Sequence, residues 1–98
     1  MSNWKRLEKK AAATLGGTRN SRGMDFSLSI GDVEHPRLSI ECKYRNKISG
    51  FLKDGIKQAE RYYPEKIPVL VLKEKHMRGE LAILKLSDFQ KLFGAIGE

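Results

Sequence analysis

Glu41 and Lys43 are two positions apart in the segment RLSIECKYR, residues 37–45, whose alternating apolar and polar side chains predict a β-strand. Residues i and i+2 of a strand share a face, so this spacing places a carboxylate beside an ammonium on the polar face. A carboxylate can bind a divalent metal ion, and an adjacent ammonium can orient or deprotonate a water and offset phosphate charge. The pair indicates metal-dependent phosphodiester hydrolysis. The alternative is a surface ion pair on an amphipathic strand, the more common meaning of such a pair.

A second carboxylate, Asp25, opens the alternating segment DFSLSI at residues 25–30. An antiparallel hairpin centred near Val33 would put Asp25 across from Glu41 on one polar face. Magnesium prefers oxygen ligands, so these two carboxylates and the backbone carbonyl of Cys42 are the expected metal ligands. We expect Mn²⁺ to substitute for Mg²⁺.

A third carboxylate, Glu8, lies in a predicted first helix that starts after Ser2 or Asn3 and ends at Gly16-Gly17. It borders the apolar stripe of that helix, where an unpaired carboxylate is costly. Either Glu8 is paired with a neighbour such as Lys5, or it is an acid turned toward the active site. The stripe consists of Trp4, Leu7, Ala11 and Leu15.

Length and charge favour one small domain, residues 1–98, that binds a polyanion. The chain has 98 residues, a formal net charge of +7, 32% charged residues and 40% hydrophobic residues. Its basic residues are spread over several segments, which fits a broad phosphate-binding surface. Any single lysine can instead simply solubilise the domain. The expected DNA contacts outside the resemblance below are Arg22 in the loop GTRNSRGM, Arg45, Lys47 and Lys57.

The remaining pattern predicts an αββαββα order, an α/β sandwich with a central mixed sheet. The run IPVLVL reads as a strand buried on both faces, parallel to the Glu41 strand. A strand after the Gly79 turn and a capping box at Ser87 complete the order, with a frayed tail from Gly94. The expected ranges after the hairpin are a helix over 49–63, strands over 67–72 and 80–86, and a helix over 87–93.

Several site classes are not expected. The single cysteine, Cys42, cannot form an internal disulfide, and its strand position predicts a small buried hydrophobe. His35 and His76 are isolated, so no zinc site is predicted. No signal peptide or membrane-spanning run is evident. We expect a cytoplasmic protein with no membrane association.

These residues together resemble the PD-(D/E)xK nuclease superfamily, and within it the archaeal and phage Holliday junction resolvases. The similar features are WKRLEKKAAATLGG, the loop TRNSRG, Asp25, the strand SIECKYR and Gln58-Ala59 in the later helix. Met24 stands where the superfamily often has proline. The strand usually found before that aspartate is compressed into roughly Gly17 to Arg19.

The resemblance implies a restriction-endonuclease-like sandwich and a magnesium-dependent DNA endonuclease of recombination and repair that cleaves four-way junctions. Its implied catalytic set is Glu8, Asp25, Glu41 and Lys43, with Glu8 an additional candidate metal ligand. Arg19 and Ser21 would contact phosphate, and Gln58 would be an accessory polar group. Symmetric cleavage of a junction needs two active sites, which implies a homodimer. Candidate dimer contacts are Phe51, Leu52, Phe89, Leu92 and Phe93.

Other functions share these features. A stand-alone VRR-NUC-type nuclease, or another small repair or restriction-like enzyme, would use the same carboxylates and lysine. A DNA-binding protein without catalysis would use only the basic surface. A third alternative is a subunit that needs a partner protein for activity.

Overall fold

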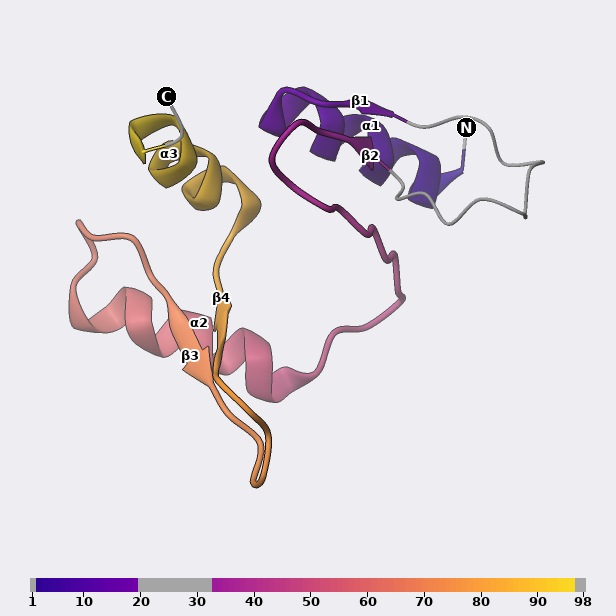
Figure 1. The fold of residues 1–98 in the computed structure, drawn as a ribbon. Helices are drawn as coiled ribbons and strands as arrows, with labels where there is room; N and C mark the ends of the chain where they lie inside the picture. The colour runs from indigo at the N-terminus through magenta and orange to yellow at the C-terminus, as the bar shows by residue number, and fades with distance from the viewer. Residues whose placement is uncertain (1, 20–32, 97–98) are drawn as a thin grey trace. The chain divides into compact units, whose positions relative to one another are not determined.

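The structure is a computed structural model that describes residues 2–19 and 33–96 (Figure 1). Its backbone contacts divide the chain into two compact units, Met1–Arg45 and Asn46–Glu98. Each unit has one helix packed against a two-stranded antiparallel sheet. The chain is therefore mixed α/β, while the single restriction-endonuclease-like sandwich stays a prediction.

Helix α1 spans Asn3–Leu15, as the sequence predicted. Gly16 ends it in the left-handed conformation at φ 78°, and the N–H of Gly17 donates to Ala12 O at 2.8 Å. This is a Schellman-type end, which favours glycine because a β-carbon is strained at positive φ. One predicted stripe residue is wrong: Trp4 is 51% exposed, with Lys5 Nζ 5.4 Å from its ring centroid. It lies in the first turn, beyond the part of α1 that packs.

Two short strands pack against α1. Strand β1 (Thr18–Arg19) pairs antiparallel with β2 (Val33–Glu34), with Arg19 opposite Val33. The core of this unit comprises Ala11, Ala12, Leu15 and Val33. The short strand at Thr18–Arg19 matches the position that the resemblance gave it.

The predicted hairpin is wrong in its centre. Val33 is a strand residue that forms an antiparallel bridge with Ile40, so the chain turns between them rather than at Val33. The His35 ring organises this turn: its Nδ1 accepts from the N–H groups of Arg37 at 3.0 Å and Leu38 at 3.2 Å. The turn is therefore centred near residues 36 and 37, three to four residues later than the alternation of hydrophobic residues suggested.

Within the predicted strand at 37–45, Ile40 alone pairs with another described residue, so the full strand stays a prediction. A strand exists only where a partner satisfies its backbone, and β2 ends at Glu34, next to the turn. The expected partner, residues 25–30 with Asp25, lies outside the described residues.

The second unit begins with α2 (Gly50–Tyr62), flanked by Ser49 and Tyr63, in agreement with the prediction. Strands β3 (Leu70–Leu72) and β4 (Leu81–Ile83) follow as an antiparallel hairpin. Gly79 has φ 72° in the connection, as a tight turn requires. Gly55 lets α2 approach β3 closely, since a β-carbon there would lie 2.8 Å from Leu70 Cδ2.

The run IPVLVL, residues 67–72, is less buried than the prediction of a strand buried on both faces. Among the described strands, β3 pairs with β4 alone and lies in a two-stranded sheet. Leu70 faces α2, whereas Val71, which points the other way along the strand, is 66% exposed. A central strand parallel to the Glu41 segment therefore stays a prediction that these two small sheets do not reproduce.

The last helix, α3 (Leu86–Ile96), differs from the prediction at both ends. It starts at Leu86, so Ser87 lies inside the helix, and the N–H of Phe89 donates to Lys85 O at 2.9 Å. It also continues through Gly94 into the tail expected to fray. The tilted stack of Phe89 on Phe93, with ring centroids 5.7 Å apart, joins successive turns.

Candidate functional site

The Glu41–Lys43 pair forms as the spacing predicted. Lys43 Nζ lies 3.1 Å from Glu41 Oε2, and the two side chains are 61% (Glu41) and 69% (Lys43) exposed. Both are therefore accessible to a large ligand. An exposed pair of this kind adds about 0–1 kcal/mol to stability. The arrangement fits a surface ion pair and an open reactive pair equally well.

Side-chain exposure from Leu38 to Lys43 alternates as predicted, although among the described residues of this segment only Ile40 forms a strand bridge. Leu38, Ile40 and Cys42 are half-buried, whereas Ser39, Glu41 and Lys43 are exposed. The period of two keeps Glu41 and Lys43 on the same side. The prediction of two faces is thus confirmed from Leu38 to Lys43, and Tyr44 breaks it because it is exposed.

Glu8 is paired with a residue that the sequence assigned to DNA. Arg19 Nε donates to Glu8 Oε1 at 2.8 Å, with side-chain exposures of 9% for Glu8 and 23% for Arg19. Burial of a lone carboxylate would be costly, and a charge-assisted hydrogen bond offsets that cost. The structure therefore agrees with the interpretation in which Glu8 is paired with a neighbour. That neighbour is Arg19 rather than Lys5.

The register of the strands relates the two ion pairs. Arg19 lies opposite Val33, and Val33 lies opposite Ile40, so these three residues share a face. Val33 is buried, which identifies this face as the one toward α1. Strands lie about 4.8 Å apart, so Ile40 is two spacings, roughly 10 Å, from Arg19. Glu41 follows Ile40 directly and is exposed, on the opposite side.

The described residues include only some of the predicted metal ligands, Glu41 and Cys42. Within residues 2–19 and 33–96, no three His, Cys, Asp or Glu side chains gather closely enough to share an ion. Asp25, Ser21 and Arg22 lie outside the described residues. Glu41 and the carbonyl of Cys42 supply oxygen donors of the kind that magnesium prefers. Glu41 Oε1 is not the oxygen in the pair with Lys43.

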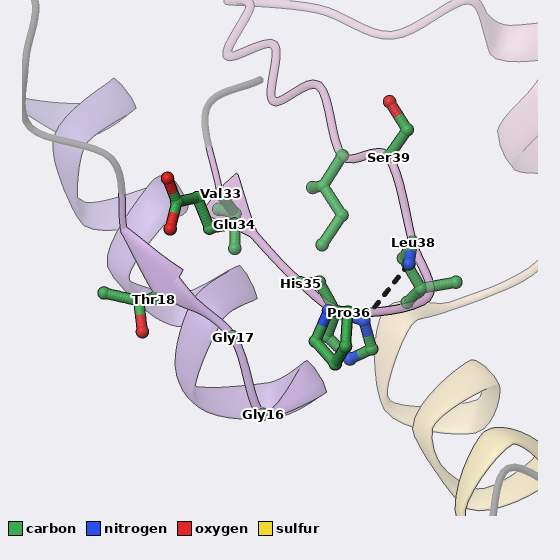
Figure 2. Close-up of a pocket in the computed structure, with 10 residues that line it drawn as sticks. Gly16, Gly17, Thr18, Val33, Glu34, His35, Pro36, Leu38 and Ser39 are labelled. Carbon is green, nitrogen blue, oxygen red and sulfur yellow. Dashed lines mark hydrogen bonds between the residues drawn. The ribbon is translucent and has the colours of Figure 1, made fainter. Parts of the chain in front are cut away.

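A residue that the sequence did not assign to the site, His35, lines a hollow that also includes Ile40, the residue before Glu41. The hollow, about 580 Å³, is lined by the end of α1, by β2 and by the turn through Ile40 (Figure 2). His35 Nε2 lies 2.8 Å from Leu15 O. Because Nδ1 accepts two backbone hydrogen bonds, Nε2 carries the proton and donates to Leu15 O. The feature of the sequence that could have identified His35 is its position directly before Pro36 in a turn.

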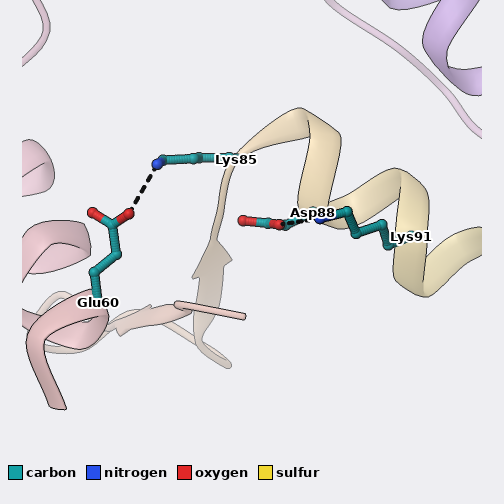
Figure 3. A network of polar contacts seen from close by, with 4 residues as sticks. All are labelled: Glu60, Lys85, Asp88 and Lys91. Atoms are coloured by element: carbon teal, nitrogen blue, oxygen red, sulfur yellow. Dashed lines mark hydrogen bonds and ion pairs between the residues drawn. The ribbon is translucent and has the colours of Figure 1, made fainter. Parts of the chain in front are cut away.

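The predicted DNA contacts of the second unit lie on its surface. Lys47, Lys57 and Gln58 are exposed, as is Arg45 at the end of the first unit. Two other lysines are engaged with carboxylates: Lys85 with Glu60 at 3.0 Å and Lys91 with Asp88 at 3.6 Å (Figure 3). Lys57 and Gln58 are adjacent on α2, so their side chains diverge by about 100° around the helix.

Comparison with family models, with curated proteins and with solved structures gave no match. In the part of the chain that the structure covers, no helix has the length and apolar character needed to cross a bilayer.

Proposed function

We propose that this protein is a magnesium-dependent, structure-selective DNA endonuclease of the Holliday junction resolvase type. The observation that carries the proposal is the exposed Glu41–Lys43 pair, with 3.1 Å between Nζ and Oε2. Both side chains are exposed, which leaves their charged groups open to a phosphodiester. The net charge of +7 supports a polyanionic substrate.

The donor set fits a magnesium ion. Glu41, the carbonyl of Cys42 and the expected ligand Asp25 would hold it, all through oxygen. When bound, the ion neutralises phosphate charge and lowers the pKa of a coordinated water. In the described arrangement Lys43 Nζ is ion-paired with Glu41, so its role is to stabilise negative charge on the phosphate.

The exposed residues Arg45, Lys47, Lys57 and Gln58 would hold the DNA backbone, and Ser21 and Arg22 would add contacts from the loop before Asp25. A junction resolvase of this size acts as a homodimer, since one small subunit carries one active site. Substrate choice then depends on how two sites are spaced on a branched DNA, a property that the single chain does not fix.

A cleavage assay tests this proposal. A labelled four-way junction, a matched duplex and a single strand are incubated with magnesium or with chelator, using the wild type, Glu41→Gln and Lys43→Ala. We expect paired, magnesium-dependent nicks on the junction alone, lost in both variants while binding persists. Cleavage of all three DNAs would identify a general or VRR-NUC-type nuclease instead.

The chain offers matched controls for this assay. Glu60 and Lys85 form a second partly exposed ion pair at 3.0 Å, so Glu60→Gln and Lys85→Ala remove the same charges elsewhere. Both variants should retain cleavage. Equal losses in the control and site variants would show that general charge, not the Glu41 site, governs the reaction.

A second candidate function is DNA binding without catalysis. It is favoured by the fact that Glu8 and Glu41 are each already paired with a cation, Arg19 and Lys43. Under this alternative the carboxylates are structural and the basic surface acts alone. Salt-sensitive binding that is unchanged by chelator, with no cut strand under any metal, would establish it.

A further inference from the structure

The Glu8–Arg19 ion pair lies between α1 and β1, on the covered face of the small sheet. Glu8 projects from the middle of α1 and Arg19 from β1, and their 2.8 Å contact joins the two elements. Thr18 is exposed and Arg19 half-buried, so β1 turns Arg19 inward. The Glu8–Arg19 pair therefore links β1 to α1.

From Arg19 the backbone ladder leads toward Glu41. Arg19 is in register with Val33, and Val33 with Ile40, the residue directly before Glu41. Whatever holds β1 on α1 therefore also sets the position of Ile40. Glu41 and Lys43 point away from this face and into solvent. The Glu8–Arg19 pair is thus largely buried beside α1, whereas the Glu41–Lys43 pair is exposed.

We infer that Glu8 and Arg19 act together as a positioning clamp: Glu8 acts through Arg19 on the placement of Glu41, and not as a ligand of the metal bound there. Arg19 in turn holds Glu8 rather than a DNA phosphate. The effect on Glu41 chemistry rests on the proposed nuclease function, whereas the clamp itself does not.

The clamp predicts a specific pattern in a double-mutant cycle. Removing one partner of a buried pair leaves the other charge uncompensated, and removing both relieves this. We expect Glu8→Gln and Arg19→Met each to lower Tm by about 5 °C or more. The combined Glu8→Gln/Arg19→Met variant should recover part of that loss. Tm values that simply add would overturn the clamp.

Cleavage of a four-way junction then separates a clamp from a metal ligand. For the combined variant, assayed below its Tm, we expect activity within about tenfold of wild type and a half-maximal magnesium concentration within about twofold. A lost carboxylate ligand would instead raise that concentration roughly tenfold or more, in a protein that is still folded, because affinity depends on the number of charged ligands. That result would overturn the proposal.

Two further measurements keep the outcomes distinct. Amide hydrogen exchange at Val33 and Ile40 should quicken in each single variant and slow again in the combined one. If wild type cuts nothing, the proposed function fails, while Tm and exchange still decide the clamp. If Glu8→Gln does not fold, Arg19→Lys replaces it as the test, because lysine keeps the cation. The Arg19→Lys protein should fold and retain activity. A folded but inactive Arg19→Lys protein with unchanged Tm would contradict the clamp.

Discussion

Gly17 lies against the backbone of Glu34, so closely that a β-carbon on Gly17 would be 2.5 Å from Glu34 O and 2.9 Å from Val33 Cγ1. The contact brings the chain after α1 beside β2. Because the nearest atom is a backbone oxygen, no side-chain rotation can relieve a clash. This position therefore needs glycine for space.

Gly17→Ala should destabilise the protein by about 1–3 kcal/mol, because the first unit must shift to admit the methyl group. Urea unfolding followed by circular dichroism measures the change. Gly94→Ala is the control, since nothing lies within 4 Å of its β-carbon and it stands in helix α3. It should stabilise by roughly 0.5–1 kcal/mol. Equal effects of the two substitutions would contradict the close approach.

Glu41→Gln should leave stability within about 0.5 kcal/mol of wild type, because its ion pair with Lys43 is exposed. Under the proposed function the same variant loses magnesium-dependent cleavage. Thermal unfolding and the junction assay on one preparation test both statements. A large fall in Tm would mean that Glu41 supports the fold, and the loss of cleavage would then carry no information about a metal site.

His35→Ala should cost about 1–2 kcal/mol, since it leaves the N–H groups of Arg37 and Leu38 and the carbonyl of Leu15 without the ring. His35→Asn should cost less, because an asparagine oxygen can accept from the N–H two residues on. Chemical denaturation of both variants gives the comparison. Identical losses would show that Nδ1 does not organise the turn.

Lys57→Ala and Gln58→Ala should weaken DNA binding without altering the fold, because both side chains are exposed on α2. Loss of one phosphate contact by Lys57 should lower the slope of log affinity against log salt by about 1. Gln58 carries no charge, so its removal should leave that slope unchanged. Binding titrations at several salt concentrations measure both, and an unchanged slope for Lys57→Ala would remove it from the interface.

Local signals in the sequence predicted the helices well. Gly16 ends α1 and Pro64 follows the end of α2, and both effects act within a few residues of the helix end. The start of α3 was predicted less well, because Leu86 enters the helix ahead of the serine that resembles a cap. Propensity alone could not choose between neighbouring starting residues.

The strands depend on partners that sequence does not name. The alternation from Leu38 to Lys43 correctly predicted which side chains are exposed. The turn, however, follows Val33, and in it the backbone N–H groups of Arg37 and Leu38 donate to His35 Nδ1. Likewise, Glu8 was predicted at the border of the apolar stripe, whereas its burial and its partner Arg19 follow from the approach of β1 to α1. The assignment of Asp25, Glu41 and Lys43 as one site stays a prediction from spacing.

The two members of the Glu8–Arg19 pair are only 11 positions apart in sequence. A segment this short loses little chain entropy when its ends meet. The helix, its glycine end and the ion pair can thus assemble before more distant segments arrive. We therefore expect residues 3–19 to form their contacts early in folding, with Val33 and then Ile40 added in turn.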